Sequence, residues 1–341
     1  MDIEALIETA HKLMADNKGL LAMDESLPTA NKRFAEVNIP QTEEYRRKYR
    51  QLIVTAPGLG DAISGAILFD ETIYQKTDDG KLFIDILKEQ GIVPGIKVDE
   101  GAVDLANFPG EKITEGIDGL RERLKKYYEL GARFCKWRAV ITIGNGIPTH
   151  ACILANTHLL ARYAALCQEA GLVPIVEPEV LMDGDNDIET CYEVTAKTHR
   201  MLFAQLHLQK VDLRGTILKP NMIIAGKKCA KQNSIDEVAD MTIKCLLENV
   251  PAIVPGIAFL SGGQSEQDAS AHLNAMHVRY KGKLPWPVTF SYARAIQEPA
   301  LHYWAGKDEN VKEAQKILVH RASLNNKARA GEYTPEMENK G

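Results

Sequence analysis

Eight short apolar runs recur along the chain, and longer amphipathic segments separate them. The runs cover residues 19–24, 62–70, 93–99, 133–141, 172–180, 215–222, 252–262 and 287–294. Intervening segments such as 118–130, 156–170 and 235–249 have the apolar spacing of helices. Eight strands that alternate with helices, without a linker or a change in composition, predict an α/β fold: a single (β/α)8 TIM barrel over residues 1–341.

An open doubly wound sheet with a second domain is the alternative architecture. Such folds usually carry a G-x-G-x-x-G turn after the first strand, and this sequence has none there. Before the first run, the apolar residues of segment 3–14 fall on one helical face, which predicts an N-terminal helix. The last residues, 331–341, are polar, and we expect them to form a short loose tail.

The composition limits the classes of partner. Of the 341 residues, 45% are hydrophobic and 26% are charged, which is typical of a globular protein with a large core. A net charge of −5 gives no electrostatic reason to expect nucleic acid or an anionic membrane as partner. The N-terminal segment lacks the basic and apolar regions of a secretory signal, and no stretch resembles a membrane span. We therefore expect a cytoplasmic location.

The cysteines and histidines argue against a metal site. The six cysteines occur singly, without a C-x-x-C pair, so we expect reduced thiols and no structural zinc. The nine histidines show no H-x-H or H-E-x-x-H spacing, which disfavours a metal-dependent enzyme. We expect no metal.

Charged residues occupy apolar runs that should be buried on both faces. Residues two apart in a strand share a face, so Lys136 lies on the same face as Arg138, and Glu177 on the same face as Glu179. Either pair alone could simply face outward or form ion pairs at an edge, without a catalytic role. In a barrel, however, strand carboxyl ends meet at one rim, where active sites form. Five cations and three carboxylates would gather there: Asp24, Lys97, Lys136, Arg138, Glu177, Glu179, Lys219 and Arg294.

This set suits Schiff-base chemistry. A lysine that is crowded by other cations and shielded from water has a lowered pKa, so its free amine can attack a carbonyl. Lys219 would have that setting near Lys136. A neighbouring carboxylic acid can then protonate the departing hydroxyl. The resulting iminium accepts electrons without help from a metal.

Two further groups of residues suit phosphate. Loops after strands seven and eight are the usual phosphate site of this barrel, and they carry Ser261, Gly262, Gly263, Ser291 and Arg294. On the opposite side, a second phosphate would meet Ser26, Lys32, Arg33 and Lys97. Two phosphate sites favour a bisphosphate as substrate.

Residues 213–222 (LRGTILKPNM) resemble the Schiff-base lysine motif of class I fructose-bisphosphate aldolases. Further matches follow in the same order through nearly the whole chain: LAMDES at 21–26, GIKVD at 95–99, KWR at 136–138, IVEPE at 175–179, FLSGGQ at 259–264 and FSYAR at 290–294. The LAMDES segment resembles plastid and bacterial members more than animal ones.

The resemblance implies a reaction and a setting. Family members cleave fructose 1,6-bisphosphate reversibly into dihydroxyacetone phosphate and glyceraldehyde 3-phosphate, in glycolysis and gluconeogenesis, with the Calvin cycle as a further setting. It also implies a homotetramer without metal or cofactor, in the cytoplasm or, as the alternative, the plastid stroma. It does not decide activity toward sedoheptulose 1,7-bisphosphate or fructose 1-phosphate.

The resemblance also implies a role for each site residue. Lys219 would be the Schiff-base nucleophile, and Glu177 the acid–base group for dehydration of the carbinolamine. Glu179 would orient Lys219 and its surroundings. Asp24 would act at the C4 hydroxyl when the C3–C4 bond breaks, and Lys136 would assist at the C2 and C4 oxygens. The C1 phosphate would meet Ser261, Gly262, Gly263 and Arg294, and the C6 phosphate Ser26, Arg33, Lys97 and Arg138.

Three features depart from the family pattern. Arg214 stands where glutamate is usual, and we expect it to affect packing before the barrel rather than chemistry. Ala293 replaces a glycine, which would strain the loop if that position requires a positive φ. The sequence ends at Gly341 without the tyrosine tail of animal members, and Tyr333 lies too early to replace it. No residue is therefore assigned to protonation of the enamine.

Three rival functions can be tested against the same residues. Transaldolase or another sugar-phosphate aldolase would share the Schiff-base lysine. A metal-dependent aldolase would need clustered histidines. A non-catalytic scaffold would not need the full set formed by Lys219, Glu177, Glu179, Asp24 and Lys136.

Overall fold

Eight parallel strands form a closed barrel in the computed structural model, which describes residues 2–339. The strand order is β1-β10-β9-β8-β7-β6-β3-β2. The prediction of a (β/α)8 barrel is confirmed, and each strand lies within a predicted apolar run. Their bounds are β1 Gly19–Met23, β2 Ile63–Leu68, β3 Val93–Lys97, β6 Phe134–Ile141, β7 Val173–Val180, β8 Ile217–Leu218, β9 Ile257–Phe259 and β10 Val288–Tyr292.

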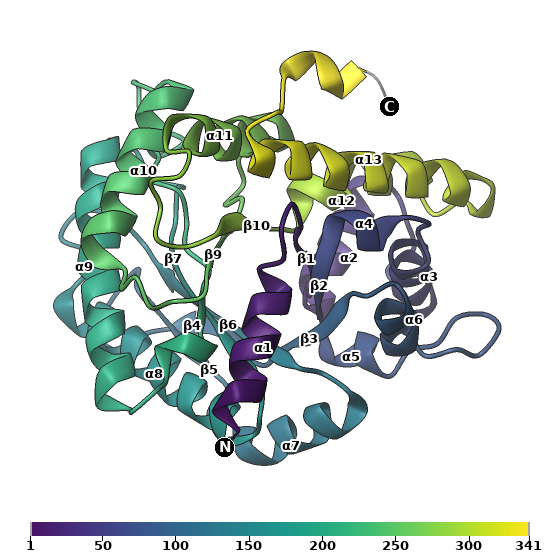
Figure 1. Ribbon diagram of the computed structural model, residues 1–341, viewed down its shortest axis with the longest axis horizontal. Helices are drawn as coiled ribbons and strands as arrows, with labels where there is room; N and C mark the ends of the chain where they lie inside the picture. Colours follow the sequence, from purple (N-terminus) through teal and green to yellow (C-terminus); the bar gives the residue numbers. More distant parts are fainter. Residues whose placement is uncertain (1, 340–341) are drawn as a thin grey trace.

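Helices surround the strands (Figure 1). Polar caps begin several of them, as where Ser234 and Glu237 form a reciprocal capping box at the start of α10. The α-helices are α1 Ile3–Leu13, α2 Leu27–Glu36, α3 Glu43–Val54, α4 Leu59–Ala62, α5 Asp70–Ile73, α6 Phe83–Glu89, α7 Leu120–Leu130, α8 His150–Glu169, α9 Ile188–Leu208, α10 Ile235–Asn249, α11 Glu266–Arg279, α12 Arg294–Trp304 and α13 Val311–Ala330. Short 3-10 helices are η1 Leu213–Gly215, η2 Asp308–Asn310 and η3 Pro335–Asn339.

Helix α1 closes the amino-terminal end of the barrel. It lies across the strands in Figure 1, and Leu6 and Leu13 pack with strand residues such as Phe134 in one buried cluster. Gly95 makes room for this packing, because a Cβ atom there would lie 2.3 Å from the Phe134 ring. Apolar side chains thus fill this end, and the charged residues lie toward the other.

A two-stranded antiparallel hairpin, β4 Gly101–Asp104 and β5 Lys112–Glu115, follows β3. The sequence did not indicate it, since its two short strands lack the alternation of apolar and polar residues that marks a half-buried strand. The hairpin lies outside the barrel sheet.

Residues 331–339 differ from the expected loose tail. Tyr333 is buried, and its hydroxyl donates a hydrogen bond to Glu338. Glu338 also forms a 2.6 Å ion pair with Arg321, a buried residue of α13. A buried guanidinium needs an anionic partner, and the polar composition of the tail supplies it.

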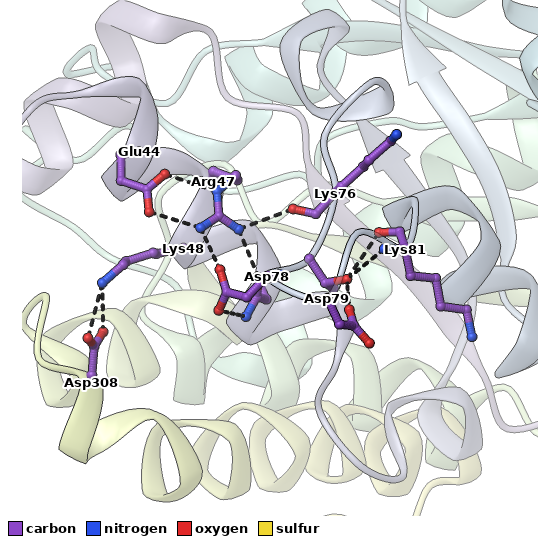
Figure 2. A network of polar contacts seen from close by, with 10 residues as sticks. Glu44, Arg47, Lys48, Lys76, Asp78, Asp79, Lys81 and Asp308 are labelled. Atoms are coloured by element: carbon purple, nitrogen blue, oxygen red, sulfur yellow. Dashed lines mark hydrogen bonds and ion pairs between the residues drawn. The ribbon is translucent and has the colours of Figure 1, made fainter.

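Exposed ion pairs tie helix α3 to distant segments (Figure 2). The Arg47 guanidinium donates hydrogen bonds to Glu44 on its own helix. It also donates to the Asp78 carboxylate and the Lys76 carbonyl in the segment after α5. Lys48 reaches Asp308 of η2. Each such exposed pair contributes little to stability, so we regard the network as fixing loop positions.

The role of α1 predicts a large effect of Leu13→Ala. Leu13 is fully buried, and its truncation should lower the free energy of unfolding by about 2–5 kcal/mol through lost apolar contact and a new cavity. Glu8→Ala on the exposed face of the same helix should cost less than about 0.5 kcal/mol. Urea unfolding measures both. Equal small losses would mean that α1 does not belong to the core.

Candidate active site

A cavity of about 1220 Å³ opens at the carboxyl ends of the strands. All of the site residues predicted from the sequence line it: Asp24, Ser26, Arg33, Lys97, Lys136, Arg138, Glu177, Glu179, Lys219, Ser261, Gly262, Gly263, Ser291 and Arg294. Lys32 lines it as well. The structure therefore brings together residues that are up to 270 positions apart in the chain.

An ion cluster occupies the centre of this cavity. Glu177 lies between two lysines, with one carboxylate oxygen 3.2 Å from Lys219 Nζ and the other 3.2 Å from Lys136 Nζ. Asp24 lies 2.6 Å from Lys136 Nζ. Strand register produces this arrangement, because Val176 of β7 is paired with Leu218 of β8, which places Glu177 beside Lys219. All four charged residues are less than 10% exposed.

The cations keep both carboxylates ionised. Burial alone would raise the pKa of Asp24, but Lys136 and Lys219 outweigh burial and lower it to about 2. The pKa of Glu177 is likewise lowered, because Lys136, Lys219 and Arg138 outweigh its burial. Burial works against the ammonium form of Lys136, yet Asp24 and Glu177 raise its pKa above the ordinary value. In the resting site Glu177 is thus a proton acceptor.

One side of the cavity has the features of an anion site. Gly262 and Gly263 both have positive φ, 58° and 79°, within a turn closed by a hydrogen bond from the Gln264 amide to the Ser261 carbonyl. Within residues 2–339, neither glycine amide donates a hydrogen bond. The Ser291 hydroxyl is buried and without a partner in the same range. Arg294 begins helix α12, whose amino terminus has no side-chain cap, and such helix ends attract anions.

The opposite side is also basic. Lys97 is held by Asp99, 2.7 Å from its carboxylate. Arg33 is 2.6 Å from Glu25, a buried carboxylate that also pairs with Arg50. These partners fix the cations in place while leaving each of them on the cavity lining.

Two lining side chains of this side, Arg138 and Ser26, have partners of their own. The Arg138 guanidinium donates a hydrogen bond to Glu179, so Glu179 contacts Arg138 rather than Lys219. Ser26 shares a hydrogen bond of 3.0 Å with Thr29.

Sequence reasoning missed Glu25, Asp99 and Lys227 as parts of the site. Asp99 ends the third run, two residues after Lys97, so strand spacing could have indicated it. Glu25 follows Asp24 directly and carried no separate signal. Lys227 lies in the loop after β8, where no periodicity places a side chain.

The departures from the family pattern lie outside the ion cluster. Ala293 has φ −103°, so the position does not require a positive φ and the expected strain is absent. Arg214 forms a 2.7 Å ion pair with Asp212, before β8 at the amino-terminal end of the barrel. Tyr333 does not line the cavity.

No group of three or more His, Cys, Asp or Glu side chains within residues 2–339 is arranged to hold a metal ion. The nearest carboxylates to Lys219 are instead engaged by lysine and arginine side chains. Over the same range, no helix has both the length and the apolarity needed to cross a membrane.

Comparisons with known proteins agree on one family. The family model described as fructose-bisphosphate aldolase class-I matches residues 5–341. A probable fructose-bisphosphate aldolase class 1 of Xanthomonas campestris is 59% identical over 98% of this chain and 99% of its own length. The cytosolic fructose-bisphosphate aldolase 4 of Arabidopsis thaliana is 51% identical over 96% of this chain and 83% of its length.

A solved structure is similar over the whole barrel. It is that of fructose-bisphosphate aldolase from Plasmodium falciparum in complex with TRAP and a small-molecule inhibitor. The TM-score is 0.95 and the sequence identity 46%, over 97% of this chain and 95% of the other.

The lowered pKa of Asp24 predicts a specific loss of stability in acid. Ionised Asp24 stabilises the folded state above about pH 4, and this contribution is lost as the pH falls toward its folded-state pKa of about 2. Between pH 5 and pH 2 the wild type should lose about 2 kcal/mol more than Asp24→Asn. Urea unfolding across this range measures the difference. Parallel curves for the two proteins would contradict the electrostatic description.

Proposed function

The chain belongs to the class I fructose-bisphosphate aldolase family, and on that premise we propose that Lys219 is its Schiff-base lysine. The protein is a lyase that cleaves fructose 1,6-bisphosphate reversibly into dihydroxyacetone phosphate and glyceraldehyde 3-phosphate. One observation supports Lys219 above all: its Nζ lies 3.2 Å from a buried carboxylate, within a cavity that has a basic site on either side.

Glu177 would accept the proton that Lys219 must lose and would later donate it to the departing hydroxyl. Its ionised carboxylate accepts that proton across 3.2 Å, and the free amine attacks the C2 carbonyl of the open-chain ketose. Loss of the Lys219 charge removes a cation beside Glu177, which raises the affinity of Glu177 for the proton. After the attack, a proton moves from nitrogen to the C2 oxygen. Glu177 then protonates the departing hydroxyl, and water leaves to form the iminium.

Asp24 and Lys136 would act on the sugar chain beyond C2. Asp24 accepts the proton of the C4 hydroxyl, the C4–O electrons form the carbonyl, and the C3–C4 electrons flow into the iminium. Glyceraldehyde 3-phosphate departs and an enamine stays on Lys219. Protonation at C3 and hydrolysis release dihydroxyacetone phosphate. Lys136, an ammonium paired with both carboxylates, would donate hydrogen bonds to the C2 and C4 oxygens.

The two basic sides would hold the two phosphates. We assign the C1 phosphate to Ser261, Gly262, Gly263, Ser291 and Arg294, and the C6 phosphate to Ser26, Arg33, Lys97 and Arg138. Glu179 would orient Arg138, which it contacts directly. A bisphosphate that spans both sites places its C2 carbon over the centre, where Lys219 lies.

The remaining assignments follow the family. We propose that the catalytic step uses no metal or cofactor, that residues 1–341 form one domain, and that four identical chains assemble. We place the protein in the cytoplasm, as for the cytosolic Arabidopsis thaliana relative, with the plastid stroma as the alternative.

Substitution of Lys219 tests the covalent role. Lys219→Met and Lys219→Arg should both reduce cleavage of fructose 1,6-bisphosphate by roughly 10⁴-fold or more, because neither side chain forms a Schiff base. The arginine variant keeps the positive charge and so separates nucleophilic from electrostatic function. Wild-type activity should persist in excess chelator. Activity retained by Lys219→Arg, or lost with chelator, would refute the proposal.

Glu177→Gln tests the proton transfer. An amide cannot accept or return the proton, so kcat should fall about 10²–10⁴-fold. Steady-state cleavage assays measure the fall, and Glu179→Gln is the matched control on the next inward position of β7. If Glu179→Gln lowered kcat as much and left KM unchanged, the acid–base role would belong to Glu179 instead.

A further inference from the structure

Backbone hydrogen bonds fix Lys227 beside the anion site. Gly226 donates to the Asn186 carbonyl at 2.8 Å, and Lys227 donates to the Met182 carbonyl at 2.7 Å. Gly226 permits this close approach, since a Cβ atom there would lie 2.2 Å from the Gly184 oxygen. The loop after β8 is thus held against the loop after β7, and Lys227 lines the cavity.

The side chain of Lys227 reaches the same point as Arg294. A Cβ atom on Gly263 would be 2.8 Å from Lys227 Nζ and 2.8 Å from Arg294 Nη2. Because both nitrogens lie 2.8 Å from the same point, they are at most twice that distance apart, about 5.6 Å. Like charges at this separation repel, and an anion between them would relieve the repulsion.

No protein anion occupies that position. Within residues 2–339, Arg294 forms no ion pair, and Lys227 forms one only with the exposed Asp183, at 3.9 Å. Hydrogen-bond donors line the same space: the free amides of Gly262 and Gly263 and the buried Ser291 hydroxyl. Hydrogen-bond donors beside two cations, of which only Lys227 has a protein counter-charge and that one is exposed, are the composition of a phosphate site.

We propose that Lys227 is a further substrate-binding residue, which pairs with Arg294 to hold the C1 phosphate of the ketose and of dihydroxyacetone phosphate. This inference rests on the proposed function. Lys227 would make the site select for a phosphate at that end, because an uncharged C1 hydroxyl leaves the two cations facing each other. Its side chain is 44% exposed, so the effect should be moderate.

The condensation reaction separates the two phosphate sites. In Lys227→Met, KM for dihydroxyacetone phosphate should rise roughly five- to tenfold, while KM for glyceraldehyde 3-phosphate and kcat stay within about twofold of wild type. Lys227→Arg should restore most of the affinity. Lys228→Met is the matched control: this exposed neighbour is outside the cavity lining and should behave as wild type.

Several outcomes would overturn the proposal. An unchanged KM for dihydroxyacetone phosphate, or equal rises for both substrates in Lys227→Met and Lys228→Met, would leave no local role for Lys227. If Asp183→Asn raised KM as much as Lys227→Met, Lys227 would act through that ion pair instead of through phosphate.

Calorimetric binding of inorganic phosphate keeps this inference separate from the proposed function, since it needs no turnover. Lys227→Met should weaken phosphate binding, and Lys228→Met should not. A wild-type protein without condensation activity that still showed this pattern would contradict the aldolase mechanism and uphold Lys227 as an anion ligand. Equal phosphate affinity in wild type and Lys227→Met would refute the role of Lys227.

Discussion

Glu177 between Lys136 and Lys219 is the interaction on which the rest of the site depends. Burying any one of these charges alone would be strongly unfavourable, and the cluster persists because each charge lies against an opposite one. The same contacts prepare the chemistry. They keep the carboxylate ionised in the resting state and place it within proton-transfer distance of the lysine that must become neutral.

The barrel makes this cluster possible by separating charged from apolar layers. Strand register brings residues of β1, β6, β7 and β8 to one mouth, and α1 closes the other end with Leu6, Leu13 and their neighbours. The apolar end supplies packing, and the charged end is held by its ion pairs. Loops beyond the strands then supply the anion-binding groups, among them the Ser261–Gly263 turn and the segment with Lys227.

Elements and faces that regular residue spacing marks in the sequence were predictable. Features that only tertiary contacts determine were not. Alternation of runs and helices indicated all eight barrel strands, and residues two apart placed Glu177 and Glu179 on one face. The β4–β5 hairpin lacked an apolar pattern, so it was missed. Hydrogen bonds between two loops position Lys227, and an ion pair with Arg33 holds Glu25. No local spacing in the sequence indicates either contact. The position of Tyr333 likewise depends on a tertiary contact, the hydrogen bond that its amide donates to Asn274 of α11.

The covalent bond between Lys219 and the ketose is the central claim, and trapping it is the most direct test. Borohydride should reduce the iminium in the presence of fructose 1,6-bisphosphate or dihydroxyacetone phosphate, and peptide mass spectrometry should locate the adduct. We predict a substrate adduct on the peptide that carries Lys219 and none without substrate. An adduct on another lysine, or none under turnover conditions, would contradict the account.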